Sequence, residues 1–308
     1  MKKNYFNINE KDLKEEDYTE YLKYKYKLET KKNLNIKNPK LYSEKIQWLK
    51  IFDNPELKTI YTDKIEVRNF IKDKIGEEYL KPIFGIWNNF DDINFNILPD
   101  SFFLKSNHGS GMYNLIKNKK EIIESVNKKE ELKEKFDRWL KINYAFKSGL
   151  ELQYKNILPK IFAEKIISEK NGLVKEYQIY CFNGKPQYIN LLSFFINKEK
   201  KHHHTIVACG MYDKNWNKQN FDFYSIQNFK VEKPKNLIKM IEIAENLSNQ
   251  FKFVRVDLVD INNNVFFSEL TFSPYSGFVN IKPYKYEKIL GDLIEIKQKT
   301  NFGFNWFN

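Results

Sequence analysis

The chain has 308 residues, 42% hydrophobic and 16% aromatic, with a formal net charge of +12. This length suits an enzyme of two or three lobes. No apolar run is long enough for a transmembrane helix or resembles a signal peptide, so we expect a cytoplasmic protein. A basic balance is typical of proteins that bind nucleic acid, anionic membranes or acidic substrates. The composition is also enriched in Lys, Asn, Ile, Tyr and Phe, which is the pattern that AT-rich coding produces. The positive charge alone therefore does not distinguish among these three kinds of partner.

Helical periodicity dominates the first part of the chain. A weak amphipathic pattern runs from Lys11 to Lys32, and a helix follows with Ser43 as its candidate N-cap. A further helix is expected from Leu57 to Ile75, with Gly76 as its C-terminal cap.

Strand and hairpin signals dominate the rest of the chain. Asn183-Gly184 between two apolar runs is a strong hairpin signal. Strands are expected at 82–90, 101–105, 113–117, 159–167, 176–182, 185–195 and 205–212, and helices at 129–144, 234–250 and 286–293. We therefore expect an α+β fold with a helical N-terminal region (1–56), a first lobe (57–163) and a second lobe (164–308).

One predicted hairpin near the C-terminus brings two carboxylates face to face. With a three-residue turn at Asn262–Asn264, the expected pairs are Ile261 with Val265, Val259 with Phe267, Asp257 with Glu269, and Arg255 with Thr271. Opposed carboxylates repel each other across a sheet, and a divalent cation between them reverses the sign. Magnesium takes one or two carboxylates together with phosphate oxygens. A solvated sheet face is the competing interpretation.

A glycine-rich turn follows the strand that ends at Lys105. The sequence Ser106-Asn107-His108-Gly109-Ser110-Gly111 could hold phosphates with its backbone N–H groups, while the Lys105 ammonium neutralises their charge. The order of residues is not that of a Walker A loop. An ordinary hairpin turn with a surface lysine is the alternative.

Three further stretches are weaker signals when taken alone. Lys64 and Arg68 would share one helix face, where they could reach a nucleotide or be solvated. The strand 163–167 could offer backbone groups to adenine, or be an edge strand. The spacing of His202–His204 does not match a zinc site, so a polar loop that touches substrate is favoured over metal binding.

The order of these features resembles the ATP-grasp fold, in which two α+β lobes clamp ATP. Six strings make the resemblance closer, and together they look like the TupA-like ATP-grasp family, named for teichuronopeptide biosynthesis and found in bacterial cell-surface polysaccharide loci. They are residues 42–49, Asp63-Lys64 with Val67-Arg68, residues 103–111, Cys181 to Pro186, Phe253 to Asp257, and Ser268 to Pro274. The resemblance spans roughly residues 35–295.

The resemblance implies a role for each matching position. Lys64 and Lys105 would contact the nucleotide phosphates, and the loop from Asn107 to Gly111 would close over them. Glu164, Lys165, Ile166 and Ile167 would form the hinge that meets adenine. Asp257 and Glu269 would hold magnesium, and Arg255 would lie near phosphate or an acyl phosphate. The sequence departs from the family pattern at Gln178, where a lysine is expected at a nucleotide contact, at Thr271, where a metal-binding Asn is common, and at Tyr275, where glycine is expected.

The resemblance implies an ATP- and magnesium-dependent carboxylate–amine ligase that works through an acyl phosphate. The expected partners are an acidic sugar, such as a hexuronic acid of a surface polysaccharide or its precursor, and an amine. We expect no nucleic acid and no membrane span, while a peripheral contact with a biosynthetic complex is compatible with this interpretation. Alternatives are a glycosyltransferase, although an Asp-x-Asp motif is missing, and a basic nucleic-acid-binding module. Alanine at Asp257 or Glu269 is expected to abolish ATP turnover and to leave the fold intact.

Overall fold

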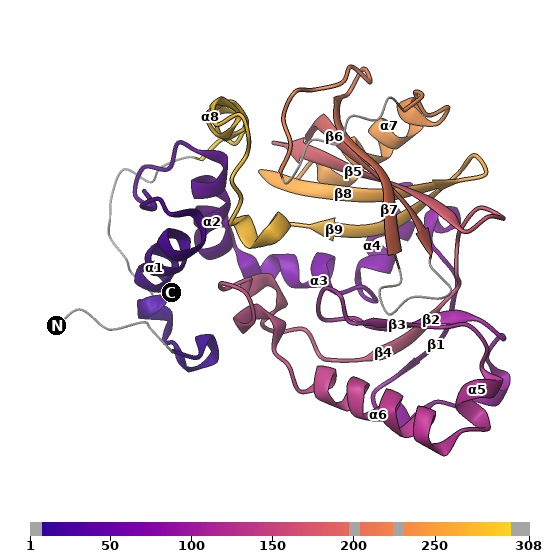
Figure 1. The fold of residues 1–308 in the computed structure, drawn as a ribbon. Coiled ribbons are helices and arrows are strands. Elements are labelled where there is room, and N and C mark those ends of the chain that lie inside the picture. The colour runs from indigo at the N-terminus through magenta and orange to yellow at the C-terminus, as the bar shows by residue number, and fades with distance from the viewer. Residues whose placement is uncertain (1–7, 197–203, 224–230, 297–308) are drawn as a thin grey trace.

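The fold is an α+β arrangement of two lobes, each built on an antiparallel sheet (Figure 1). The computed structural model describes residues 8–196, 204–223 and 231–296. Within these ranges no helix is long and apolar enough to cross a membrane. The predicted fold class is therefore confirmed. The exact lobe boundaries stay predictions.

The first lobe is a four-stranded sheet backed by one long helix. Its strand order is β1-β4-β2-β3. Side chains alternate between the two faces of β2. One face carries Phe102 and Leu104, which are buried with Phe136 of α6. The other face carries Phe103 and Lys105 and looks toward the second lobe. The elements are β1 (Ile83–Trp87), β2 (Phe102–Ser106), β3 (Tyr113–Ile116), α5 (Lys120–Ile123), α6 (Val126–Leu140) and β4 (Ile161–Glu164).

The second lobe is a five-stranded sheet in the order β7-β6-β5-β8-β9. Helix α7 packs on one face, where Met240 and Leu247 join Val254 and Val256 in the largest core cluster. The opposite face looks toward the first lobe (Figure 1). The elements are β5 (Leu173–Phe182), β6 (Lys185–Ile196), β7 (His204–Asp213), α7 (Leu237–Ser248), β8 (Phe253–Ile261) and β9 (Asn264–Thr271).

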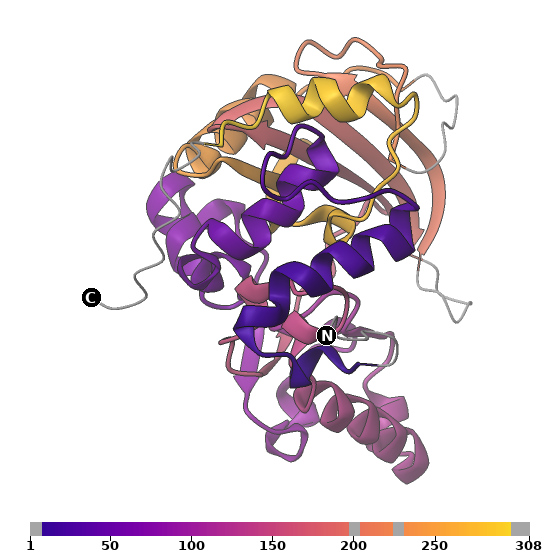
Figure 2. The ribbon, with the colours of Figure 1, turned by 90° about the vertical axis from the view of Figure 1, so that its left-hand side faces the viewer.

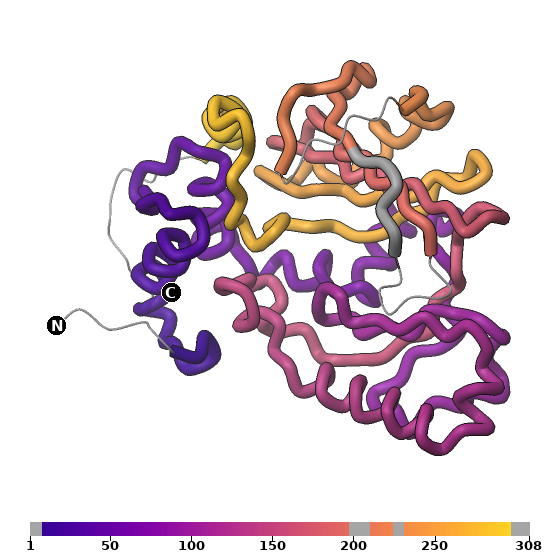
Figure 3. The backbone as a smooth tube through the Cα atoms, viewed as in Figure 1, coloured from indigo at the N-terminus to yellow at the C-terminus, as the bar shows by residue number. Residues whose placement is uncertain are grey.

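The N-terminal helices lie against both lobes, as the turned view shows (Figure 2). Helix α2 packs on α8, so these two segments lie side by side although they are far apart in the sequence (Figure 3). Helix α1 buries Leu22 and Tyr26 against Leu150 and Leu152, which lie in the segment leading to β4. The elements are α1 (Tyr18–Thr30), α2 (Tyr42–Phe52), α3 (Thr59–Thr62), α4 (Val67–Ile75) and α8 (Lys285–Asp292).

Two helix predictions need correction. The single helix expected from Leu57 to Ile75 is two short helices, α3 and α4, because Asp63 leaves helical geometry and its carboxylate accepts from the backbone N–H of Ile65 and Glu66. At the start of α2, Ser43 is not the cap. The Glu44 carboxylate accepts from the backbone N–H groups of residues 35, 40 and 41, whereas Ser43 donates to Glu287 of α8.

The carboxylate hairpin has the predicted register at one end only. Arg255 pairs with Thr271 and Asp257 with Glu269, as predicted. At the other end the turn has two residues, Asn262 and Asn263, both with left-handed φ angles. An irregularity after Asp257 absorbs the difference, so Leu258 pairs with Phe267 and Val259 with Phe266. The predicted three-residue turn and the predicted pairs Val259 with Phe267 and Ile261 with Val265 were therefore wrong, while both carboxylates keep their positions.

Candidate active site

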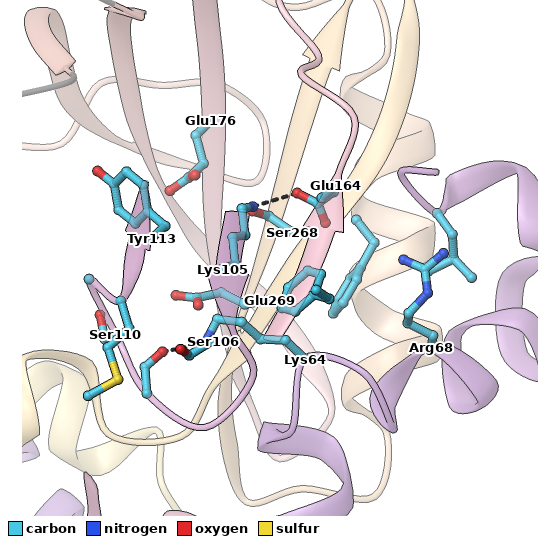
Figure 4. Close-up of a pocket in the computed structure, with 16 residues that line it drawn as sticks. Lys64, Arg68, Lys105, Ser106, Ser110, Tyr113, Glu164, Glu176, Ser268 and Glu269 are labelled. Carbon is cyan, nitrogen blue, oxygen red and sulfur yellow. Dashed lines mark hydrogen bonds and ion pairs between the residues drawn. The ribbon is translucent and has the colours of Figure 1, made fainter. Parts of the chain in front are cut away.

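Strand β2 supplies the first cation of the site. Lys105 lies next to the end of β2, on the face that looks at the second lobe, and its Nζ is 2.5 Å from Oε2 of Glu164 at the end of β4. Burial raises the pKa of the Glu164 carboxyl, but Lys105, Lys81 and Arg68 outweigh it and hold that pKa below its usual value. The Glu164 carboxyl is therefore ionised at neutral pH, and Figure 4 shows its contact with Lys105 near the middle of a cavity.

The glycine turn after β2 lines the same cavity, though with fewer residues than predicted. Ser106, Gly109, Ser110 and Gly111 line it. The Ser106 Oγ is buried and has no hydrogen-bond partner among the described residues. Gly109 has no room for a side chain, because a Cβ would lie 2.7 Å from the Tyr144 ring and 2.8 Å from the sulfur of Met112.

Asn107 and His108 point away from the cavity, which corrects the prediction that they contact phosphate. The Asn107 side chain donates to Asp63 at 2.9 Å and to the Leu158 carbonyl at 3.0 Å, and it accepts from the Lys160 backbone at 2.7 Å. His108 Nε2 lies 3.0 Å from the Trp139 carbonyl oxygen. Both side chains are fully buried, so they fix the turn from behind.

Lys64 reaches the turn from the junction between α3 and α4. The prediction that Lys64 and Arg68 share one helix face was wrong. Lys64 lies just before α4, whereas Arg68 lies within α4. Both side chains nevertheless line the cavity. Lys64 Nζ donates to the Gly109 carbonyl at 2.6 Å. Burial lowers the pKa of the Lys64 ammonium, while Glu269 is the main group that opposes this shift.

The predicted hinge contributes one residue only. Glu164 lines the cavity, whereas Lys165, Ile166 and Ile167 do not. The Lys165 N–H donates to the Pro82 carbonyl and is thus held against the first lobe. The segment that was expected to meet adenine therefore touches the cavity only at its first residue.

Gln178 is buried and does not line the cavity. It accepts from Asn190 and donates to Glu176, both at 2.9 Å, so it supports its neighbour. Glu176 does line the cavity, and our sequence reading missed it. Strand alternation places residue 176 on the same face of β5 as 178, which is the signal that could have found it. Burial and the nearby Glu269 raise the pKa of the Glu176 carboxyl.

Of the two hairpin carboxylates, Glu269 lines this cavity, whereas Asp257 is buried and does not. Arg255 Nε and Nη2 donate to the two oxygens of Asp257 at 2.7 and 2.6 Å, and Nη2 also reaches Thr271 Oγ1 at 3.2 Å. Glu269 Oε1 accepts from Thr271 at 3.1 Å and lies 3.5 Å from Arg255. Lys64 and Arg255 outweigh the effect of burial and lower the pKa of Glu269.

A second cavity, of about 510 Å³, adjoins the first and was not predicted as a unit. Ser110 and Glu269 line both cavities, so they mark where the two meet. Its volume lies in the range of about 300–1,000 Å³ that is common for small-molecule sites. Its walls come from α1, the segment 144–154, the hairpin and the loop 273–278. They include Lys25, Glu29, Tyr144, Lys147, Glu151, Tyr154, Arg255, Thr271, Ser273, Tyr275 and Phe278.

The loop 273–278 has an unusual backbone. Tyr275, Ser276 and Gly277 have φ angles of 55°, 56° and 71°, all left-handed. Such conformations are costly for residues other than glycine, and they persist where the surrounding structure imposes them. Here Gln47 and Lys50 of α2 donate to the Ser276 carbonyl at 3.0 and 2.9 Å. The helical N-terminal region therefore shapes the second cavity.

Comparison with known proteins identifies the family. A family model described as TupA-like ATPgrasp matches residues 44–295. The chain belongs to the TupA-like ATP-grasp family. The predicted family and fold are confirmed; the reaction and the groups that it joins are a matter for proposal. No curated protein matches the chain.

Several solved structures are similar to this TupA-like chain at low identity. D-alanine–D-alanine ligase from Bacillus anthracis shares 14% identity with a TM-score of 0.45, covering 76% of this chain and 66% of that one. The Helicobacter pylori enzyme shares 17% (TM-score 0.42; 82% and 69% covered). Phosphoribosylamine–glycine ligase from Thermotoga maritima shares 12% (TM-score 0.40; 70% and 48% covered). The chain thus spans about two thirds of the length of the Bacillus anthracis enzyme.

Proposed function

We propose that this protein is an ATP- and magnesium-dependent carboxylate–amine ligase that acts through an acyl phosphate. The carboxylate is a hexuronic acid of a surface polysaccharide or its precursor, and the amine is an amino acid or an amino alcohol. One observation carries the proposal: a cation-lined cavity and a second, larger cavity meet at Ser110 and Glu269. A phosphoryl group in the first cavity could then be transferred to an acceptor in the second.

The first cavity has the groups that a nucleoside triphosphate needs. Lys64, Lys105 and Arg68 supply positive charge, and the turn at 109–111 supplies backbone N–H groups. The unpartnered Ser106 hydroxyl is a further donor. At the other end, Glu176 has one oxygen held by Gln178, which leaves the second for a ribose hydroxyl. These contacts support ATP as the bound nucleotide.

The hairpin fits a magnesium ion. Glu269 lines both cavities and lies opposite Asp257, whose two oxygens accept from Arg255 and would exchange that contact for the ion. Carboxylate oxygens are the hard donors that magnesium prefers. Among the described residues no group of three or more His, Cys, Asp or Glu could hold a metal, which suits an ion that takes its other ligands from phosphates and water. Asp257, Glu269 and Thr271 would hold the ion, which when bound would neutralise charge on the transferring phosphoryl group.

The protein's own residues would position the reacting groups. Lys64 and Lys105 neutralise the phosphates. Arg255, at the wall of the second cavity, orients the substrate carboxylate. A carboxylate oxygen attacks the γ-phosphorus, and the bond from that phosphorus to the ADP oxygen breaks. The amine nitrogen then attacks the acyl carbon, the bond from carbon to the phosphate oxygen breaks, and phosphate leaves with the electron pair.

The lining of the second cavity supports an acidic sugar as substrate. The rings of Tyr144, Tyr154, Tyr275 and Phe278 offer apolar faces for the C–H groups of a sugar ring. Serine hydroxyls at 148 and 273 can bond to sugar hydroxyls. Lys147 and Arg255 provide positive charge for a carboxylate. This combination of rings, hydroxyls and cations favours a hexuronate over a small apolar acid.

Thermal stabilisation tests the nucleotide assignment. We expect ATP with magnesium to raise the melting temperature, and UDP-glucose with manganese, which carries no sugar carboxylate, to have a smaller effect. Lys105→Met should abolish the ATP shift, whereas Lys129→Met, at an exposed position of α6, should leave it unchanged. Stabilisation by UDP-sugars and not by ATP would overturn the ligase proposal in favour of a glycosyltransferase.

A further inference from the structure

Glu151 is a carboxylate at the wall of the second cavity that the proposed phosphoryl transfer does not use. It is only 7% exposed, and it lines the cavity together with Arg255 and Glu269. Its Oε1 accepts a short hydrogen bond of 2.6 Å from Ser273 Oγ, which in turn accepts from Gln153 Nε2 at 2.8 Å. This chain of donors fixes the direction in which the carboxylate points.

The backbone before Glu151 is held in a strained shape. Gly149 and Leu150 both have left-handed φ angles, of 93° and 58°. The Glu10 carboxylate accepts from both of their N–H groups, at 2.8 and 3.2 Å, and from the Tyr21 hydroxyl at 2.8 Å. Strain of this kind is typical of functional positions. The N-terminal region, which lies outside the matched span 44–295, therefore sets the position of Glu151.

No cation of the described residues contacts the carboxylate, although the Lys50 ammonium lies near enough to lower its pKa. Among the described residues, no Lys or Arg nitrogen lies within 4.0 Å of Glu151 in an ion pair. The nearby Lys50 instead donates to Gln47 at 2.8 Å and to the Ser276 carbonyl. Burial raises the pKa of Glu151 to about 6, although Ser273 and Lys50 oppose the shift; Glu10 and Glu269 add to it. A buried carboxylate that no cation contacts directly can pair with a ligand that brings a positive charge.

We propose that Glu151 binds the ammonium group of the incoming amine and removes its proton. This proposal rests on the proposed ligase function. An amine is protonated at neutral pH and cannot attack in that form. Glu151 accepts one proton from the R–NH₃⁺ group, and the freed nitrogen lone pair attacks the acyl carbon. The carbon–oxygen bond to phosphate then breaks. The second amine proton is lost to water as the amide forms.

The chemistry of Glu151 suits this task better than that of its neighbours. A general base works best when its pKa lies near the operating pH. Glu269 has a lowered pKa and faces Lys64, so it is a weak base. Glu29 lies at the mouth of the cavity and is paired with Lys25 at 3.2 Å. Glu151 therefore combines the location, the orientation and the proton affinity that the step requires.

Hydroxylamine separates this role from acyl phosphate formation. Unlike an alkylamine, it is largely unprotonated at neutral pH, so it needs no base. Wild type and Glu151→Gln are each incubated with ATP and magnesium. The amine is either hydroxylamine or glycine, and the carboxylate substrate is glucuronate, galacturonate or UDP-glucuronate. We expect the variant to keep hydroxamate formation and to lose amide formation by about 10²–10⁴-fold. The exposed Glu131→Gln on α6 is the matched control.

The outcomes are distinct. Equal loss of hydroxamate and amide in a folded Glu151→Gln would overturn the base role and leave the ligase proposal standing. No hydroxamate from wild type with any of the acids would overturn the proposed function and the base role together. Ser273→Ala gives a second test that keeps the carboxylate. Because it removes the bond that lowers the pKa of Glu151, the amide pH profile should move to higher pH; an unmoved profile would contradict the proposal.

Discussion

Asp257 and Glu269 face each other across the hairpin, yet they should differ in their effect on stability. The perturbations are Asp257→Asn and Glu269→Gln, compared without metal or nucleotide. Arg255 holds both oxygens of Asp257, and the two side chains are 7% and 1% exposed. Glu269 is 34% exposed and lies 3.5 Å from the same guanidinium.

The expected magnitudes follow from this geometry. Removing one partner of a buried ion pair costs about 3–5 kcal/mol, because the other charge stays buried. The asparagine keeps one acceptor oxygen, and Thr271 remains a partner of Arg255, so Asp257→Asn should cost about 3 kcal/mol. The half-buried contact between Glu269 and Arg255 should contribute less than about 1 kcal/mol after solvent screening, and Glu269→Gln also removes the main counter-charge of Lys64. The structure thus revises the expectation that both carboxylates are dispensable for folding.

Urea unfolding measures the difference directly. Asp257→Asn should unfold at a clearly lower urea concentration than either wild type or Glu269→Gln. The double variant Arg255→Gln with Asp257→Asn should be less destabilised than the sum of the two single variants, because the orphaned charge is removed. If Asp257→Asn is as stable as wild type, the buried pair does not exist as described and the reasoning fails.

Three further predictions concern the two cavities. Glu176→Gln should weaken ATP binding about tenfold, because one good hydrogen bond is lost. In calorimetry the variant should bind ATP and 2′,3′-dideoxy-ATP equally well. A variant that still binds ATP more tightly would contradict the ribose contact. Glu10→Gln should destabilise the fold by about 1.5–3 kcal/mol and slow ligation while ATP still stabilises the protein; an unchanged ligation rate would refute its positioning role. The raised pKa of Glu151, about 6 against 4.5, means that its ionisation opposes folding. Stability should therefore fall as pH rises through 6, and Glu151→Gln should gain about 2 kcal/mol on wild type between pH 4 and pH 8; parallel stability curves would contradict this.

Local patterns predicted the parts of the site that depend on neighbours in sequence. Strand alternation gave the pairing of Asp257 with Glu269, since a buried face fixes the register. It failed at the turn because left-handed Asn262 and Asn263 close the hairpin in two residues. The glycine turn was located correctly, but which side chains point inward depends on partners such as Asp63 and Leu158.

The second cavity could not be predicted because its walls meet only in the folded chain. Glu151 and Ser273 are separated by 122 residues, and their hydrogen bond forms when the segment before β4 packs on the loop after β9. Gly149 hints at a special backbone shape, whereas the left-handed Leu150 next to it has no signal in the sequence. His202 and His203 lie outside the described residues, and the side chain of His204, at the start of β7, is not described, so their contact with substrate stays a prediction.

The most direct test of the central claim follows the oxygen atoms of the acceptor. A glucuronate whose two carboxylate oxygens are both the heavy isotope is ligated to an amine in the presence of ATP and magnesium, and the released phosphate is analysed by mass spectrometry. Because the carboxylate oxygen attacks the γ-phosphorus before the amine attacks carbon, we predict one heavy oxygen in each phosphate released with ADP. Amide formation with unlabelled phosphate would contradict an acyl phosphate built across the two cavities.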